Sequence, residues 1–105
     1  MSNDKNVLIC KRVYFYSSKD EEAFFEWIKK IDCIKETWAL RDELYLKVGS
    51  SRLSDKSLRD LLALFYRYKI DMKQLSRFLN ERNREWFRDG VGPKGYWHRR
   101  VFGAK

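Results

Sequence analysis

Residues 18–31 carry the clearest helical pattern in this sequence. Their apolar side chains recur at the spacing that lines one face of a helix: Phe24, Trp27, Ile28 and Ile31. Ser18 followed three residues later by Glu21 matches a capping box, and two lysines end the segment, where the helix dipole favours cations. A helix with one apolar face needs another layer to cover, so the other segments must supply that layer.

Three other segments have the composition and alternation of strands. The first, residues 7–17, is rich in valine, isoleucine, tyrosine and phenylalanine. The second and third, residues 33–39 and 43–48, are joined by a short turn at residues 40–42. In the third segment every second residue is aliphatic, which predicts a half-buried strand that pairs with its neighbour as a hairpin.

Two more helices are predicted in the C-terminal half. Ser54 can cap a helix over residues 55–68, in which leucines and Phe65 repeat the helical spacing. Asp71 followed by Gln74 matches a second capping box, which predicts a third helix over residues 72–87, ended by the glycines and proline that follow. Residues 95–103 are rich in aromatic side chains and could dock as a last short strand.

The order β-α-β-β-α-α, with a final strand if the tail pairs, predicts an α+β fold. We expect a two-layer sandwich in which helices cover one face of a small antiparallel or mixed sheet. A chain of 105 residues suffices for one domain and is too short for two, so residues 1–105 should form a single domain. Residues 88–105 form a basic aromatic tail, either docked or partly mobile.

Several classes of protein are disfavoured by what the sequence lacks. It has no run of 18 apolar residues, and its N-terminus lacks the features of a signal peptide, so we expect a cytoplasmic protein that is not in a membrane. Cys10 and Cys33 match no paired motif and are expected to be core or bystander thiols. With one histidine and no ligand cluster, we expect no metal and no cofactor.

No residue set in the sequence matches a catalytic motif. His98 is the only histidine, and it could form a nucleophile–base pair only with Cys10 or Cys33. Cys10 lies in an apolar predicted strand, where burial raises a thiol pKa and suppresses its reactivity. The carboxylates at residues 20–22 are explained by helix capping, and Glu81 and Glu85 by ion pairs on a helix face. We therefore expect a protein that is not an enzyme.

The net charge of +8 is concentrated in the last third of the chain. Residues 1–65 hold 12 basic and 11 acidic side chains, whereas residues 66–105 hold 11 basic and 4 acidic ones. Helical spacing would align four of the cations as an outward stripe on the third helix: Lys73, Arg77, Arg84 and Arg88. Four tail residues would extend this surface: Trp97, His98, Arg99 and Arg100.

A basic surface with aromatic side chains has two functional interpretations and one structural one. Arginine and tryptophan are common anchors at protein interfaces, and an acidic protein would be attracted to this surface. The same residues could hold the phosphates and bases of RNA or DNA. Alternatively, the aromatic side chains only close the core and the arginines are solvated.

Three segments carry a resemblance to a known class of proteins: VYFYSSKDEEAFFEWIKKI at residues 13–31, LRDLLALFYRYKIDMKQLSRFLN at 58–80, and YWHRRVFG at 96–103. The chain resembles small bacterial single-domain immunity proteins of polymorphic or contact-dependent toxin systems. The resemblance implies one protein partner and no catalytic residues. Immunity proteins against nucleases are often acidic, and this chain is basic, so its partner would have to present an acidic surface.

These observations together predict a non-enzymatic binding protein. It would neutralise or regulate an acidic-surfaced protein partner, such as a toxin, through the third helix and the tail. The alternative is an RNA- or DNA-binding module that uses the same surface.

Overall fold

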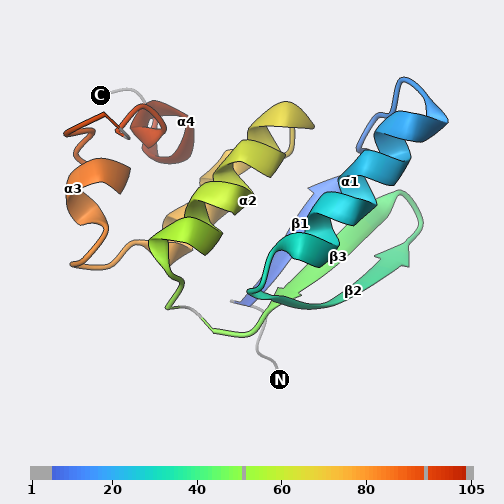
Figure 1. Ribbon diagram of the computed structural model, residues 1–105, viewed down its shortest axis with the longest axis horizontal. Helices are drawn as coiled ribbons and strands as arrows, with labels where there is room; N and C mark the ends of the chain where they lie inside the picture. Colours follow the sequence, from blue (N-terminus) through green and yellow to red (C-terminus); the bar gives the residue numbers. More distant parts are fainter. Residues whose placement is uncertain (1–5, 51, 94, 104–105) are drawn as a thin grey trace.

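A three-stranded antiparallel sheet with helices packed against it gives this chain an α+β fold, as the sequence predicts (Figure 1). The computed structural model describes residues 6–50, 52–93 and 95–103. Its elements are β1 (Val7–Lys11), α1 (Ser18–Lys30), β2 (Ile34–Leu40), β3 (Glu43–Val48), α2 (Asp55–Arg67), the 3-10 helix η2 (Met72–Phe78), α3 (Arg84–Phe87) and α4 (His98–Phe102). The predicted hairpin and the helix after Ser54 are confirmed within one residue or two.

The strand order is β1-β3-β2, with β3 in the centre and both neighbours antiparallel to it. Leu8 pairs with Leu46 and Cys10 with Leu44, which places these side chains on the face that α1 crosses, with α2 beside it (Figure 1). This arrangement confirms the two-layer sandwich and makes its sheet antiparallel rather than mixed.

One apolar core joins the sheet to the helices. Its largest fully buried side chains come from β1, α1 and its C-cap, β3, α2, η2 and α3: Leu8, Phe24, Ile31, Leu46, Leu58, Leu61, Leu62, Leu64, Phe65, Leu75, Phe78 and Phe87. The helical periodicity of residues 55–67 therefore has the expected role, because all four leucines of α2 are fully buried.

Strand β1 is shorter than predicted and ends at Lys11. Arg12 adopts a left-handed backbone (φ 50°), and its N–H donates to the carbonyl oxygen of Asp42 at 2.9 Å, so the chain turns away from the sheet there. The capping residue of α1 is Ser17 and not Ser18, because the Ser17 hydroxyl accepts from the N–H of Asp20.

The prediction of one continuous helix over residues 72–87 is wrong. The segment forms the short 3-10 helix η2, a break, and one turn of α-helix, α3. Within the break the Asn80 side chain accepts from the N–H groups of Arg82 and Asn83, while Asn83, which is 1% exposed, donates to the carbonyl of Phe78. Asparagine side chains thus replace the helical backbone bonds, which is how this residue type interrupts helices.

The edge of the sheet at β1 is closed by side chains of η2. The N–H of Ile9 donates to Oε1 of Gln74 at 2.9 Å, and Nε2 of Gln74 donates to the carbonyl of Ile9 at 2.8 Å. Nη1 of Arg77 donates to the carbonyl of Val7 at 2.9 Å. These side chains take the place that another strand would occupy and hold η2 against the sheet.

The expectation of a strand in the tail is also wrong, since residues 98–102 form helix α4. Val101 is buried, and the ring of Phe102 lies 5.1 Å from that of Phe87, so α4 packs against the core. A Cβ atom at Gly95 would lie 2.4 Å from the carbonyl carbon of Gly90, which shows how closely the chain folds back on itself before α4.

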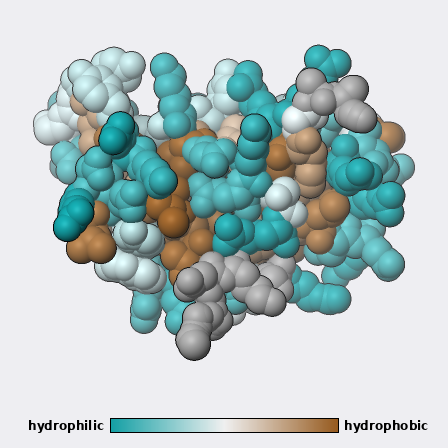
Figure 2. All heavy atoms as spheres, turned by 180° about the vertical axis from the view of Figure 1, so that it is seen from behind, coloured by the Kyte–Doolittle hydropathy of each residue, from teal (hydrophilic) through white to brown (hydrophobic). Residues whose placement is uncertain are grey.

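Among the residues that the structure describes, no helix covers the other face of the sheet, and Figure 2 views the molecule from that side. Apolar atoms appear there in patches between hydrophilic side chains (Figure 2). Trp38 of β2 and Tyr45 of β3 lie opposite each other, and their nearly parallel rings stack with centroids 5.5 Å apart. Among the described residues, no helix is long and apolar enough to cross a membrane.

Candidate functional site

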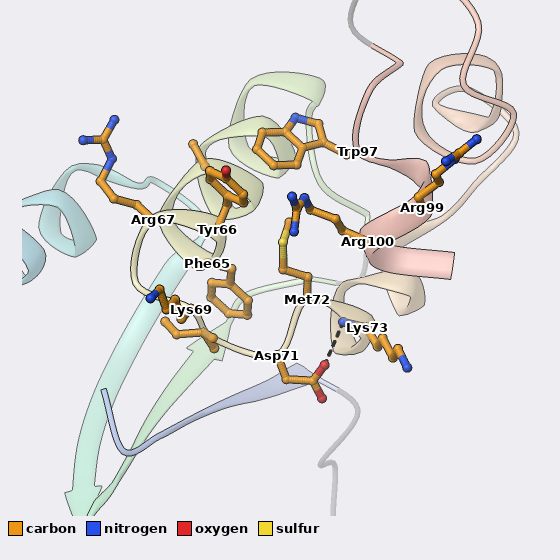
Figure 3. A pocket seen from close by; sticks show the side chains of 12 residues that line it. Phe65, Tyr66, Arg67, Lys69, Asp71, Met72, Lys73, Trp97, Arg99 and Arg100 are labelled. Carbon is orange, nitrogen blue, oxygen red and sulfur yellow. Dashed lines mark hydrogen bonds between the residues drawn. The ribbon is translucent and has the colours of Figure 1, made fainter. Parts of the chain in front are cut away.

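A groove of about 1040 Å³ lies between the C-terminal end of α2, the start of η2 and the helix α4 (Figure 3). Its lining is Ala63, Phe65, Tyr66, Arg67, Lys69, Ile70, Asp71, Met72, Lys73, Trp97, Arg99 and Arg100. In Figure 3, Phe65 and Met72 lie in the middle, Arg67 and Lys69 on one side, and the α4 residues on the other. The groove therefore brings together segments some 30 positions apart in the chain.

The α2 side of the groove is shaped by the way that helix ends. The N–H of Ile70 donates to the carbonyl of Phe65, and the N–H of Lys69 to that of Tyr66, the two bonds of a Schellman motif. Lys69 is the residue in the left-handed conformation (φ 59°), where glycine is preferred. A lysine at this position adopts a backbone conformation that is less favourable for it than for glycine, and it places a positive charge on the groove.

The opposite side of the groove is formed by the residues that open α4. The ring of Trp97 lies 5.6 Å from that of Tyr66 in an edge-to-face contact. The guanidinium of Arg100 lies over the ring of Tyr66, 4.6 Å from the ring centroid, in a cation–π contact. Tyr66 is half exposed, so this aromatic wall is open to a ligand.

The groove is strongly basic. Five cations line it and one carboxylate, that of Asp71. Asp71 caps η2 by accepting from the backbone N–H of Lys73 at 3.0 Å, so this carboxylate already has a structural use (Figure 3). In the described part of the chain, every ion pair lies elsewhere, and the groove cations have no carboxylate partner.

Four of the eight predicted site residues meet in this groove: Lys73, Trp97, Arg99 and Arg100. The stripe expected from helical spacing does not exist, because η2 and α3 are separate elements. Arg77 is bonded to β1 and to the carbonyl of Gln74. Arg84 is the first residue of α3 and Arg88 directly follows its last. Each lies within 4 Å of the carboxylate of Asp89, and neither lines the groove.

His98 is also predicted as a site residue, but it faces the loop before α4. Its Nδ1 lies 3.0 Å from the carbonyl oxygen of Gly95, and a Cβ atom at Gly90 would lie 2.6 Å from the same nitrogen. The imidazole is therefore packed between two glycines and helps to shape the turn into α4.

Sequence reasoning missed the α2 contribution to the site, namely Tyr66, Arg67 and Lys69. One signal was available in the sequence. The helical phase breaks at Lys69, and a lysine at the position where a helix usually ends in glycine is a departure from the common pattern.

The two thiols lie away from this groove and are both free. Burial raises the pKa of Cys10 from 9.0 to about 12, which keeps this thiol protonated at neutral pH. Burial also raises the pKa of the half-buried Cys33. Within the described residues no three cysteine, histidine or acidic side chains gather as metal ligands.

No protein-family model, curated protein sequence or solved structure matches this chain. The chemistry of the groove is therefore the guide to function. Guanidinium and ammonium groups bind carboxylates or phosphates, and the rings of Tyr66 and Trp97 add apolar contact area.

Proposed function

We propose that this chain is a non-enzymatic binding protein that recognises an acidic surface of a partner protein through the groove between α2, η2 and α4. The observation that carries the proposal is the five cations that line the groove without an ion pair in the described residues. Charged side chains placed together without counterions attract an acidic partner and speed its association.

The arrangement of the aromatic rings favours a protein over a nucleic acid. Bases bind by stacking on open ring faces. In this groove Arg100 covers a face of Tyr66, and Trp97 makes tilted or edge contacts with Tyr66 and Tyr96. Rings held in this way are suited to anchor an apolar side chain of a protein.

We further propose that binding neutralises or regulates the partner, as in the immunity proteins that the sequence resembles, and that it occurs in the cytoplasm. Free thiols at Cys10 and Cys33 are compatible with a reducing compartment. A partner toxin would present its carboxylates to the groove.

The test is co-purification from the native host with two charge-matched variants. Arg99→Gln with Arg100→Gln removes two charges from the groove, whereas Arg84→Gln with Arg88→Gln removes two charges from the two ends of α3. We expect the wild type and the α3 variant to retain the same partner and the groove variant to lose it. Equal retention by all three proteins would refute the proposed site.

RNA or DNA binding is the alternative, and the exposed ring of Tyr96 beside the cations keeps it worth testing. Titration with generic RNA and duplex DNA at low and physiological salt separates it from protein binding. Nucleic-acid affinity that falls steeply as salt rises, with no protein partner retained, would replace our proposal, because counterion release sets that slope.

A further inference from the structure

We propose that the groove selects a short acidic segment that carries one apolar anchor residue with carboxylates on both sides of it. This inference rests on the proposed function, since it specifies the partner chemistry of the same groove. It adds a requirement that charge alone does not impose, namely the apolar anchor.

The first step is the position of the charges. Arg67 and Lys69 lie on the α2 side of the groove and Arg99 on the other side (Figure 3). The guanidinium of Arg67 also contacts the ring of Trp27, and that of Arg100 reaches from α4 over the ring of Tyr66, 4.6 Å from its centroid. A ligand that lies between them meets cations on both flanks. Its carboxylates must therefore stand on both sides of its centre to reach them.

The second step is the apolar surface between these flanks. Tyr66 and Met72 lie between the two charged sides, and Trp97 lies over them from α4 (Figure 3). Met72 is buried, and Arg100 covers one face of Tyr66, but the Tyr66 side chain is still half exposed, so the uncovered part of its ring offers contact area to an apolar side chain. A purely acidic segment would leave this apolar surface exposed to water, so the complex would lack the stabilisation that burial of the surface provides.

The third step is size. A groove of about 1040 Å³ is comparable with pockets that hold drug-sized ligands, about 300–1,000 Å³. It admits a few side chains and not a folded domain. The segment is therefore a short part of the partner, placed where a buried anchor carries much of the binding energy.

The experiment uses the full chain and three short fluorescent peptides, studied by anisotropy at physiological salt. The first has glutamates on both sides of a central leucine, the second replaces the leucine by serine, and the third keeps the leucine but replaces the glutamates by glutamine. We expect the first to bind about tenfold more tightly than the second, as burial of a leucine side chain predicts. We expect the third not to bind.

A variant connects this preference to the groove. Tyr66→Ser removes an exposed ring and should keep the fold; we expect it to abolish the difference between the first two peptides. Equal affinity of both acidic peptides for the wild type would overturn the anchor and leave the proposed function intact. If neither of the two acidic peptides binds, the apolar anchor and the proposed function are both overturned.

Discussion

Lys69 shows at the scale of one residue how the groove and the fold make opposite demands. Its left-handed backbone favours glycine, and its charge lies on the groove. A strained backbone position costs stability that other contacts must offset, and the proposed function gives the ammonium group of Lys69 a role in binding. Stability and binding should therefore respond in opposite directions when this residue is replaced.

Replacing Lys69 by glycine should raise the free energy of unfolding by about 1 kcal/mol, because glycine adopts this conformation without the Cβ clash. The same variant should bind the acidic partner more weakly. Lys69→Gln is the control, since it removes the charge and keeps the strain, so it should lose affinity without gaining stability. Urea unfolding and anisotropy titration measure the two effects, and a glycine variant less stable than wild type would contradict the prediction.

Cys10 gives a prediction about pH at the same scale. Burial raises the pKa of its thiol from 9.0 to about 12, so above pH 9 the unfolded chain loses this proton while the folded chain keeps it. The contribution of Cys10 to stability is thus complete below pH 9 and is lost as the pH rises toward 12.

Relative to Cys10→Ala, the wild type should lose about 1.4 kcal/mol of unfolding free energy for each pH unit above 9. Urea unfolding of both proteins across this range isolates the thiol, because all other titrating groups are common to them. Parallel pH profiles would show that Cys10 ionises in the folded protein as readily as in the unfolded one.

At the scale of elements, the sequence predicted those whose signals are local. The helices α1 and α2 and the hairpin of β2 and β3 follow from caps, periodicity and a short turn. The segment 72–87 kept a helical period of apolar residues, but Asn80 and Asn83 bonded to neighbouring backbone groups and ended the helix. Apolar periodicity indicates which side chains are buried, but it does not indicate where side chains compete with the helix for backbone hydrogen bonds.

The groove was predicted only in part for a related reason. The sequence predicts Lys73 as part of a basic stripe on a third helix, and Trp97, Arg99 and Arg100 as a basic and aromatic cluster in the tail. Their meeting with Tyr66 and Lys69 depends on the packing of α4 against the core through Val101 and Phe102, a contact between distant segments that no local pattern encodes.

Gln74 is the residue that joins two elements, and its removal should loosen the sheet edge. Gln74→Ala leaves the N–H and carbonyl of Ile9 without their partner, which should cost about 1–2 kcal/mol of unfolding free energy. Gln74→Glu keeps an acceptor for the N–H of Ile9 but loses the donor to its carbonyl, so its free energy of unfolding should lie between those of the wild type and Gln74→Ala.

Amide hydrogen exchange at Ile9 measures the edge directly. Exchange should be fastest in Gln74→Ala and slowest in the wild type, whereas the amide of Leu46 in the central strand should stay protected. If Ile9 exchanges at the same rate in all three proteins, Gln74 does not protect β1.

At the scale of the whole molecule, the charge surplus has a definite place. Residues 66–105 carry nearly all of the net +8, and the structure places eight of their eleven cations in two kinds of setting. Arg77, Arg84 and Arg88 bind backbone or carboxylate groups of the protein itself, while those of the groove face solvent or aromatic rings. All of these cations contribute to the long-range field, whereas under the proposed function only those of the groove contact the partner.

This division separates the two rate constants of binding. Arg99→Gln with Arg100→Gln and Arg84→Gln with Arg88→Gln reduce the net charge equally, so both pairs should lower the association rate by a similar factor at low salt. Only the groove pair should raise the dissociation rate, because it alone removes contacts made in the complex. Surface plasmon resonance with the acidic partner or the leucine-containing peptide resolves the two rates. If the pair at Arg84 and Arg88 dissociates faster, the partner contacts α3, and a surface like the predicted stripe would be correct. The long-range field could not explain that result, because both pairs change the net charge equally.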